Sequence, residues 1–154
     1  MNLAAFERAQ VAAFAYRETR YTGSLDCMKA VCYVLRNRVK AGWGHSSWLI
    51  VLAHAGAVAG NEELDAATAD DVIRDNTSDR LLQLLLRDID DIYLGQDLFV
   101  DTVRGIVCGD EPGRAALYYN FVDRPARLWF IENIIRRPQE HPQVGNVGPM
   151  MLFR

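Results

Sequence analysis

The chain has 154 residues, of which 50% are hydrophobic, which suits one globular domain with a sizeable core and excludes a disordered protein. Its formal net charge of −3 argues against nucleic-acid binding. The acidity is concentrated in residues 51–100, which carry eleven acidic and three basic side chains, so the two ends of the chain are not acidic.

The first third of the chain predicts two helices joined by a turn. Apolar residues at helical spacing indicate a helix over residues 3–17, with Glu18 in its last turn or just beyond it. Residues 22–24 predict a turn, in which Ser24 caps a second helix over residues 25–40.

The middle of the chain predicts three further helices and one connection. A helix over residues 46–57, capped by one of the two serines at its start, is apolar on nearly every side and is expected to be central in the core. Residues 60–79 are rich in Asp and Glu and predict a solvated surface connection with one short turn of helix at most. Helices are expected again over residues 79–94 and 97–108.

The character of the sequence changes after Gly109. The aromatic content of residues 116–121 predicts a short strand, and residues 150–153 can pair with it in a hairpin or ribbon. Prolines and glycines are expected to keep residues 138–149 irregular. The expected fold is therefore mainly α (α+β), a single helical domain over residues 1–154 with a small β element.

The three cysteines are an odd number, and Cys27 and Cys32 lie in an apolar helical pattern, so we expect reduced core residues and not disulfides. The three histidines lack the spacing of a zinc site, so no metal is expected, and no cofactor either. No apolar run reaches the length of a membrane span.

Two segments carry the chemistry. Residues 16–23 place a carboxylate, Glu18, where an apolar helix gives way to a turn that ends at a glycine. Residues 109–120 lie about 90 residues later and end in Tyr118, Tyr119 and Asn120. Together they indicate one acid facing a carbohydrate-like surface.

These segments resemble the cell-wall hydrolase family of the spore-cortex-lytic type, lysozyme-like domains that cut the glycan strands of peptidoglycan. The resemblance covers roughly residues 10–40 and 105–153 and leaves the middle unmatched. Thr19 stands where the family has Ala, and Pro149 and the two methionines after it stand where the family often has His. The matching residues are Glu18-Thr19-Arg20, Leu35-Arg36-Asn37-Arg38-Val39, Glu111 to Asn120, Trp129, and Val147-Gly148 with Phe153.

The resemblance implies a lysozyme-like fold, peptidoglycan as the partner and Glu18 as the catalytic residue. Burial against apolar groups favours the protonated form of a carboxyl group, which a proton donor to a glycosidic oxygen needs. No second acid stands out in either segment, which favours a lytic transglycosylase with one acid–base residue over a muramidase-like hydrolase with two carboxylates. The expected substrate-binding residues are Arg20, Tyr118, Tyr119, Asn120 and Trp129.

Other interpretations stay open at this point. Glu18 can be a surface acid paired with a neighbouring arginine, Trp129 can be a core residue, and only one of the two adjacent tyrosines can face a ligand. The chain can also be a non-catalytic glycan-binding module, or an all-α protein-interaction module whose partner contacts the acidic residues 60–79. Residues 1–8 show no secretion signal, so the expected location is the cytoplasm, or the cell wall after export, injection or phage-type release.

Overall fold

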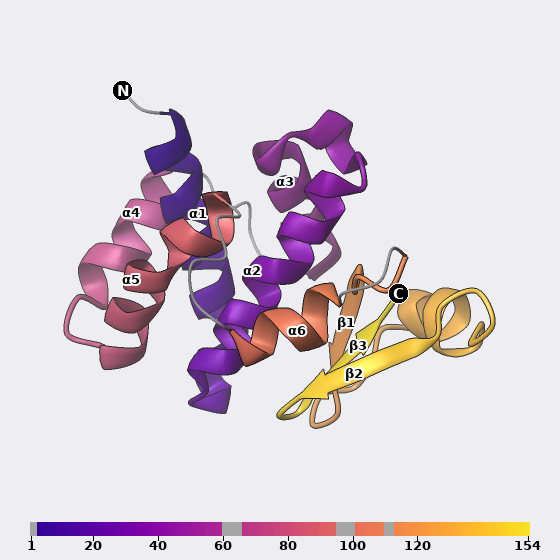
Figure 1. Cartoon of the computed structure of the whole chain (residues 1–154). Helices are drawn as coiled ribbons and strands as arrows, with labels where there is room; N and C mark the ends of the chain where they lie inside the picture. The colour runs from indigo at the N-terminus through magenta and orange to yellow at the C-terminus, as the bar shows by residue number, and fades with distance from the viewer. Residues whose placement is uncertain (1–2, 60–65, 95–100, 110–112) are drawn as a thin grey trace.

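The computed structural model describes residues 3–59, 66–94, 101–109 and 113–154. Most of these residues are helical, and a small three-stranded antiparallel sheet lies at one end of the molecule (Figure 1). The predicted fold class, mainly helical with a small β element, is confirmed.

Two helices in the first third of the chain form the centre of the core. Helix α1 spans Leu3–Thr19 and α2 spans Leu25–Lys40, in agreement with the prediction, and the two helices pack against each other. Between them lies the short 3-10 turn η1, Arg20–Thr22, which ends at Gly23 with a φ of 63°. The Ser24 hydroxyl accepts a hydrogen bond from the amide of Cys27 at 3.2 Å and so caps α2, as predicted.

The acidic middle of the chain contains a helix, which corrects the prediction of a solvated connection. Helix α4, Ala66–Asp75, packs against α1, because Ala69 is buried and Val72 packs against the core. These two residues are three apart and therefore share one helix face, while the acidic residues take the other. Residues 60–65 of the predicted connection lie outside the described residues.

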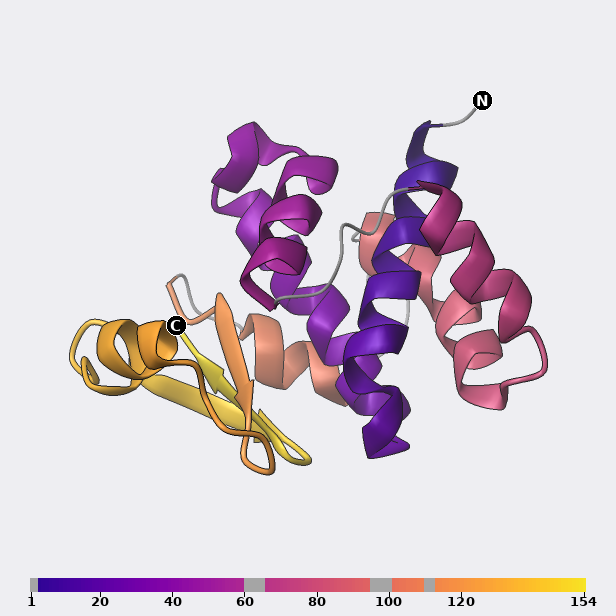
Figure 2. The same cartoon turned by 180° about the vertical axis from the view of Figure 1, so that it is seen from behind.

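Two more helices complete the body of the molecule. Helix α5, Arg80–Leu94, contacts both α1 and α2, and α6, Thr102–Cys108, lies between α2 and the sheet (Figures 1 and 2). Asp101 caps α6 by accepting a hydrogen bond from the amide of Val103 at 2.9 Å. The predicted helix over residues 97–108 is thus described only from residue 102, since residues 97–100 lie outside the described residues.

Helix α3, Trp48–Ala59, is less central than its composition predicts. Val51 and Leu52 are buried, but the side chain of Ile50 is 51% exposed and His54 is exposed as well. The helix lies at the edge of the bundle, where it contacts α1, α2 and the 3-10 turn η2, Trp43–Ser46 (Figure 2). This apolar helix therefore covers the core from outside, whereas its hydrophobic pattern had predicted a central position.

The sheet has the order β1-β3-β2, so the last strand lies in the middle. Strand β1, Tyr118–Phe121, pairs antiparallel with β3, Met150–Phe153, which confirms the predicted pairing. Strand β2, Gln143–Val147, pairs with the other edge of β3, although its segment was expected to be irregular. A register shift between Gln143 and Gly145 leaves Val144 without a pairing partner in β3, as in a β-bulge.

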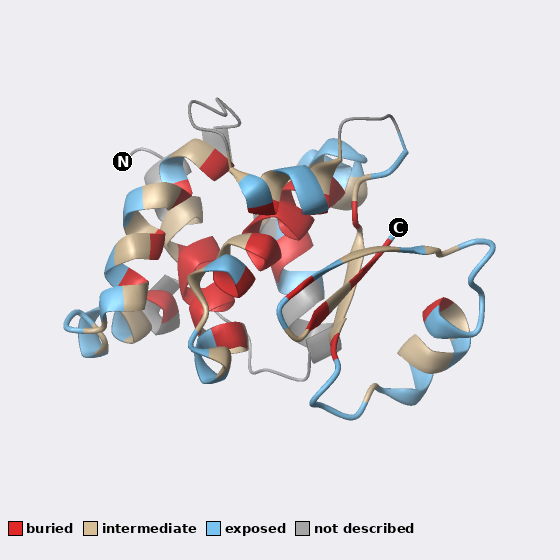
Figure 3. Cartoon of the chain, turned by 60° about the horizontal axis from the view of Figure 1, so that its bottom comes forward, coloured by how far each residue is buried: buried red, intermediate tan, exposed pale blue. Residues whose placement is uncertain are grey.

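A short helical segment joins β1 to β2 on the outer side of the sheet (Figure 3). It consists of α7, Leu128–Phe130, continued by the π-helical turn η3, Ile131–Ile135. Within the described ranges, no helix has both the length and the apolar character to cross a bilayer. Cys27, Cys32 and Cys108 are free thiols, and the first two are buried, as expected.

Candidate active site

Glu18 lies in the last turn of α1, and local hydrogen bonds fix the chain on both sides of it. The Thr19 hydroxyl donates to the carbonyl oxygen of Ala15 at 2.6 Å, and the Thr22 hydroxyl donates to the carbonyl oxygen of Thr19 at 2.6 Å. Gly23 then turns the chain into α2 with a positive φ that favours glycine. The Glu18 side chain, at this fixed corner, is half-buried.

Folding brings Tyr119 of β1 within range of the charge of Glu18, although the two residues are about 100 positions apart in the sequence. Burial raises the pKa of the Tyr119 phenol well above its usual value, and the negative charge of Glu18 raises this pKa further. The positive charges of Arg38 and Arg124 act on the phenol in the opposite direction. A phenol with its usual pKa of about 10 is already protonated at neutral pH, so Tyr119 is a hydrogen-bond donor there with or without these influences.

A row of aromatic side chains extends from Tyr119 towards the turn after α1. The Tyr119 and Phe121 rings meet edge to face with centroids 5.8 Å apart, and the Phe121 and Tyr21 rings do so at 5.7 Å. The Tyr21 hydroxyl donates a hydrogen bond to Asp123 Oδ1 at 2.9 Å. The Arg124 guanidinium lies 3.9 Å from the centre of the Tyr21 ring. The loop after β1 is thus attached to the turn that follows Glu18.

Sequence reasoning missed Phe121, Asp123 and Arg124 as parts of this site. One signal was present for Phe121, because positions 119 and 121 alternate along β1 and so share one side of the strand, whereas Asp123 lies in the turn that follows it. The structure therefore places a second carboxylate, Asp123, against the turn that follows Glu18, where the sequence had indicated only one acid.

Two buried polar residues of α2 hold β1 in place. The Asn37 side-chain amide donates to the carbonyl oxygens of Val107 and Ala116, at 3.2 and 2.9 Å. Arg38 Nε donates to the carbonyl oxygen of Leu117 at 2.7 Å. Asn37 and Arg38, which belong to the second matching motif, thus bind the chain that enters β1.

Tyr118 and Asn120 lie on the opposite side of β1 from Tyr119, as alternation along a strand requires. The Tyr118 ring packs edge to face between Trp43, at 5.5 Å, and His141, at 5.1 Å. The Asn120 side chain donates to the carbonyl oxygen of Phe121 at 3.4 Å. Of the two adjacent tyrosines, Tyr119 is therefore the one that packs against the helical core and whose pKa responds to the charge of Glu18.

The structure gives Arg20 and Trp129 other neighbours than Glu18. The Arg20 guanidinium lies 6.0 Å from the centre of the Tyr16 ring, near Asp79 in the turn between α4 and α5. The Tyr16 hydroxyl itself donates to Asp79 Oδ2 at 2.5 Å. Trp129 is 54% exposed and lies in α7, on the far side of the sheet from α1, so it is not a core residue (Figure 1).

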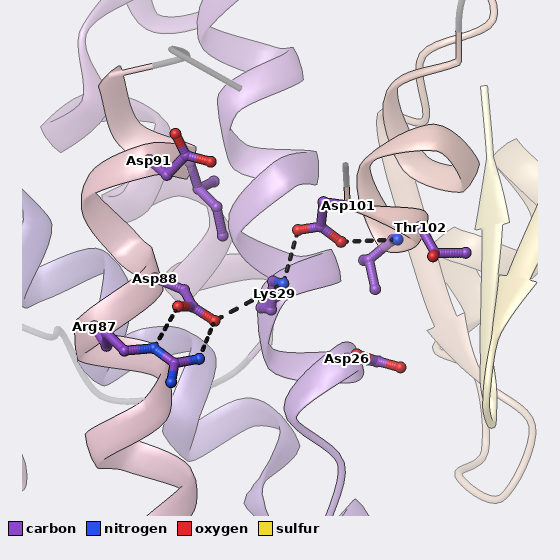
Figure 4. A pocket seen from close by; sticks show the side chains of 9 residues that line it. Asp26, Lys29, Arg87, Asp88, Asp91, Asp101 and Thr102 are labelled. Atoms are coloured by element: carbon purple, nitrogen blue, oxygen red, sulfur yellow. Dashed lines mark hydrogen bonds and ion pairs between the residues drawn. The ribbon is translucent and has the colours of Figure 1, made fainter. Parts of the chain in front are cut away.

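A pocket of ≈ 650 Å³ lies elsewhere, between α2, α5 and α6, and none of the predicted site residues lines it (Figure 4). Four of its charged side chains bind one another. Lys29 Nζ lies 2.7 Å from Asp101 and 3.9 Å from Asp88, and Asp88 also pairs with Arg87 at 2.9 Å. The Tyr33 hydroxyl donates to Asp101 at 2.8 Å. These ion pairs join three helices, and Asp26 and Asp91 add further acidic side chains to the lining.

The described residues contain no group of three or more His, Cys, Asp or Glu side chains placed to hold a metal ion. Comparisons with models of protein families, with curated proteins and with solved structures find no match to this chain. The resemblance to the spore-cortex-lytic type therefore rests on the motif residues alone.

Proposed function

We propose that this protein cleaves the glycan strands of peptidoglycan, with Glu18 as the acid–base residue of a lytic transglycosylase. The observation that supports this proposal is the position of Glu18 at the end of α1, within electrostatic reach of the protonated Tyr119 phenol. Folding thereby joins the two segments that carry the resemblance, an acid and a row of aromatic side chains.

In this mechanism, protonated Glu18 gives its proton to the glycosidic oxygen while the bond from that oxygen to C1 of the sugar breaks. The C6 hydroxyl of the same sugar then attacks C1, and the Glu18 carboxylate accepts the proton that this hydroxyl loses. The product is a 1,6-anhydro sugar, and no water enters the reaction. The Tyr119 hydroxyl donates a hydrogen bond to a sugar oxygen.

A second candidate is hydrolysis with two carboxylates, Glu18 and Asp123. Asp123 favours it, because this residue accepts a hydrogen bond from Tyr21 in the turn that follows Glu18. A third candidate is a glycan-binding module without catalysis.

The test is mass spectrometry of purified peptidoglycan after incubation with the protein. Anhydro termini support the transglycosylase, reducing termini indicate hydrolysis, and binding without cleavage indicates the third candidate. Glu18→Gln keeps the shape of the side chain and removes the transferable proton, so cleavage is expected to fall by at least about 10²-fold. Glu7→Gln, the same change in the same helix, is the matched control and should cleave like the wild type. Equal cleavage by Glu18→Gln would rule out the mechanism.

Tyr119→Phe separates two roles of the tyrosine. It keeps the ring and its contact with Phe121 but removes the hydroxyl. If the hydroxyl acts as a donor to the substrate, Tyr119→Phe is expected to cleave more slowly while folding normally. Tyr118→Phe is the control on the opposite side of the strand, and its cleavage should not change.

A further inference from the structure

The segment that joins β1 to β2 exposes an unusual share of the apolar side chains of this protein. Seven large apolar side chains are exposed in the described part of the chain, and four of them lie between residues 122 and 135. Three belong to the helical segment 128–135 itself: Leu128 is 66% exposed, Trp129 54% and Ile135 39%. We call these three residues the apolar face.

The opposite side of this helical segment is already packed on the sheet. Ile134 is 1% exposed, and the Phe130 ring meets the Phe153 ring of β3 with centroids 5.6 Å apart. The residues of the apolar face are spaced by one and six positions, so they lie on the outer side of the helix. The segment therefore presents apolar groups on two sides, and only the inner side is covered (Figure 3).

Basic side chains stand at both ends of the apolar face. Arg127 precedes the helical segment and Arg136 follows it, and both are exposed. Among the described residues neither has an ion-pair partner, whereas the next residue, Arg137, pairs with Glu140 at 3.5 Å. Glu132 is the acidic residue on the outer side. Its one negative charge is set against the two positive charges of Arg127 and Arg136, so the apolar face and its flanking residues carry a net positive charge.

We propose that the apolar face docks on the surface of an anionic phospholipid bilayer. Leu128, Trp129 and Ile135 enter the boundary between headgroups and acyl chains, and Arg127 and Arg136 meet lipid phosphates. The helix lies on the bilayer and does not cross it. The segment is already folded on the sheet, so docking costs no helix formation.

Three other occupants fit the observations less well. A sugar ring stacks on flat aromatic faces, which accounts for Trp129 but not for the aliphatic Leu128 and Ile135. A stable protein partner buries about 800 Å² on each side, and three side chains supply on the order of a few hundred Å². A second copy of this chain, paired antiparallel through the same face, would place Arg127 of one copy beside Arg136 of the other at both ends, so that like charges meet.

The experiment is sedimentation of the purified protein with vesicles of phosphatidylglycerol and phosphatidylcholine, compared with vesicles of phosphatidylcholine alone. We expect binding to the anionic vesicles that weakens as salt is added, and at least about tenfold weaker binding to the neutral vesicles. The double variant Leu128→Ser/Ile135→Ser should weaken binding at least about tenfold, and so should Arg127→Gln/Arg136→Gln. Ile50→Ser is the matched control, because Ile50 is also exposed but lies on α3, and it should bind like the wild type.

Several outcomes would overturn the proposal. These are no binding to anionic vesicles, equal binding to neutral vesicles, and binding that the Leu128→Ser/Ile135→Ser variant retains. A wild-type dimer that this variant loses in analytical ultracentrifugation would assign the face to self-association. Loss of peptidoglycan binding in this variant, without vesicle binding by the wild type, would assign the face to the glycan. The vesicles contain no glycan, so the result does not depend on whether the protein cleaves peptidoglycan.

Discussion

Asn37 provides the sharpest test of how the fold holds the candidate site, because one side chain links α2, α6 and the start of β1. The side chain is 5% exposed and donates from one nitrogen atom to the carbonyl oxygens of Val107 and Ala116. In Asn37→Ala the Val107 carbonyl keeps the hydrogen bond from the Ala116 amide at 2.8 Å, whereas the Ala116 carbonyl loses its donor from Asn37.

The size of the effect follows from these bonds. A buried carbonyl left without its donor costs about 1–3 kcal/mol, and the lost bond to Val107 costs about 1 kcal/mol more. We therefore expect Asn37→Ala to lower the free energy of unfolding by about 2–4 kcal/mol. Asn37→Asp should lower it further, because it places a carboxylate oxygen against the two carbonyl oxygens.

The assay is equilibrium unfolding in urea, with the m-value compared between variants so that a change in midpoint reports stability. Lys40→Ala is the control, since Lys40 is exposed in the same helix and its loss should change the free energy by less than about 0.5 kcal/mol. If Asn37→Ala is as stable as Lys40→Ala, the two hydrogen bonds do not hold the sheet to the helices and the argument is wrong.

Two further predictions concern pH. Burial acts to raise the pKa of Asp101, but Lys29 and the Tyr33 hydroxyl outweigh it and hold this pKa below its usual value. The ionised Asp101 carboxylate therefore stabilises the folded state above about pH 3.9, and this stabilisation is lost as the pH falls through the folded-state pKa. Thermal unfolding between pH 2 and 6, about two units either side of the usual value, should therefore show a smaller acid-induced loss in Asp101→Asn than in the wild type. Burial, and next the hydrogen bond to Asp123, raise the pKa of Tyr21 to about 12. The protonated phenol therefore stabilises the folded state, and this stabilisation is lost as the pH rises from about 10, the usual pKa of tyrosine, through about 12. NMR titration of tyrosines labelled at Cζ should show a lower midpoint for Tyr21 in Asp123→Ala, and an unchanged midpoint would contradict the assigned bond.

The parts of the fold that the sequence predicted are those with local signals. Helix α2 agrees with its predicted bounds because Ser24 caps its start and Gly42 follows its end. The pairing of residues 116–121 with residues 150–153 was predicted because both segments are short and apolar between turn residues.

The parts that were missed depend on neighbours distant in sequence. Helix α4 was read as a solvated connection because its acidic face dominates the composition, while Ala69 and Val72 become a core face only against α1. Strand β2 contains Gly145 and became a strand because β3 offers it a free edge. Local patterns carry no information about such partners.

The candidate site was predicted in the same partial way. Glu18 and Tyr119 were assigned to one site from separate segments, and the structure places the charge of the first near the phenol of the second. The contacts of Arg20, Asn120 and Trp129 lie elsewhere, because a motif fixes the order of residues and not the side of the strand or helix on which each one stands.

The order of the strands also decides when this site can form. Strand β1 borders only on β3 in the sheet, and β3 follows both other strands in the sequence. During synthesis the helices α1 and α2 can pair through contacts close in sequence, whereas β1 must wait until the ribosome has released residues 150–153. The surroundings of Glu18 are therefore completed after α1 and α2 have paired, and a nascent chain carries its acid long before it carries Tyr119.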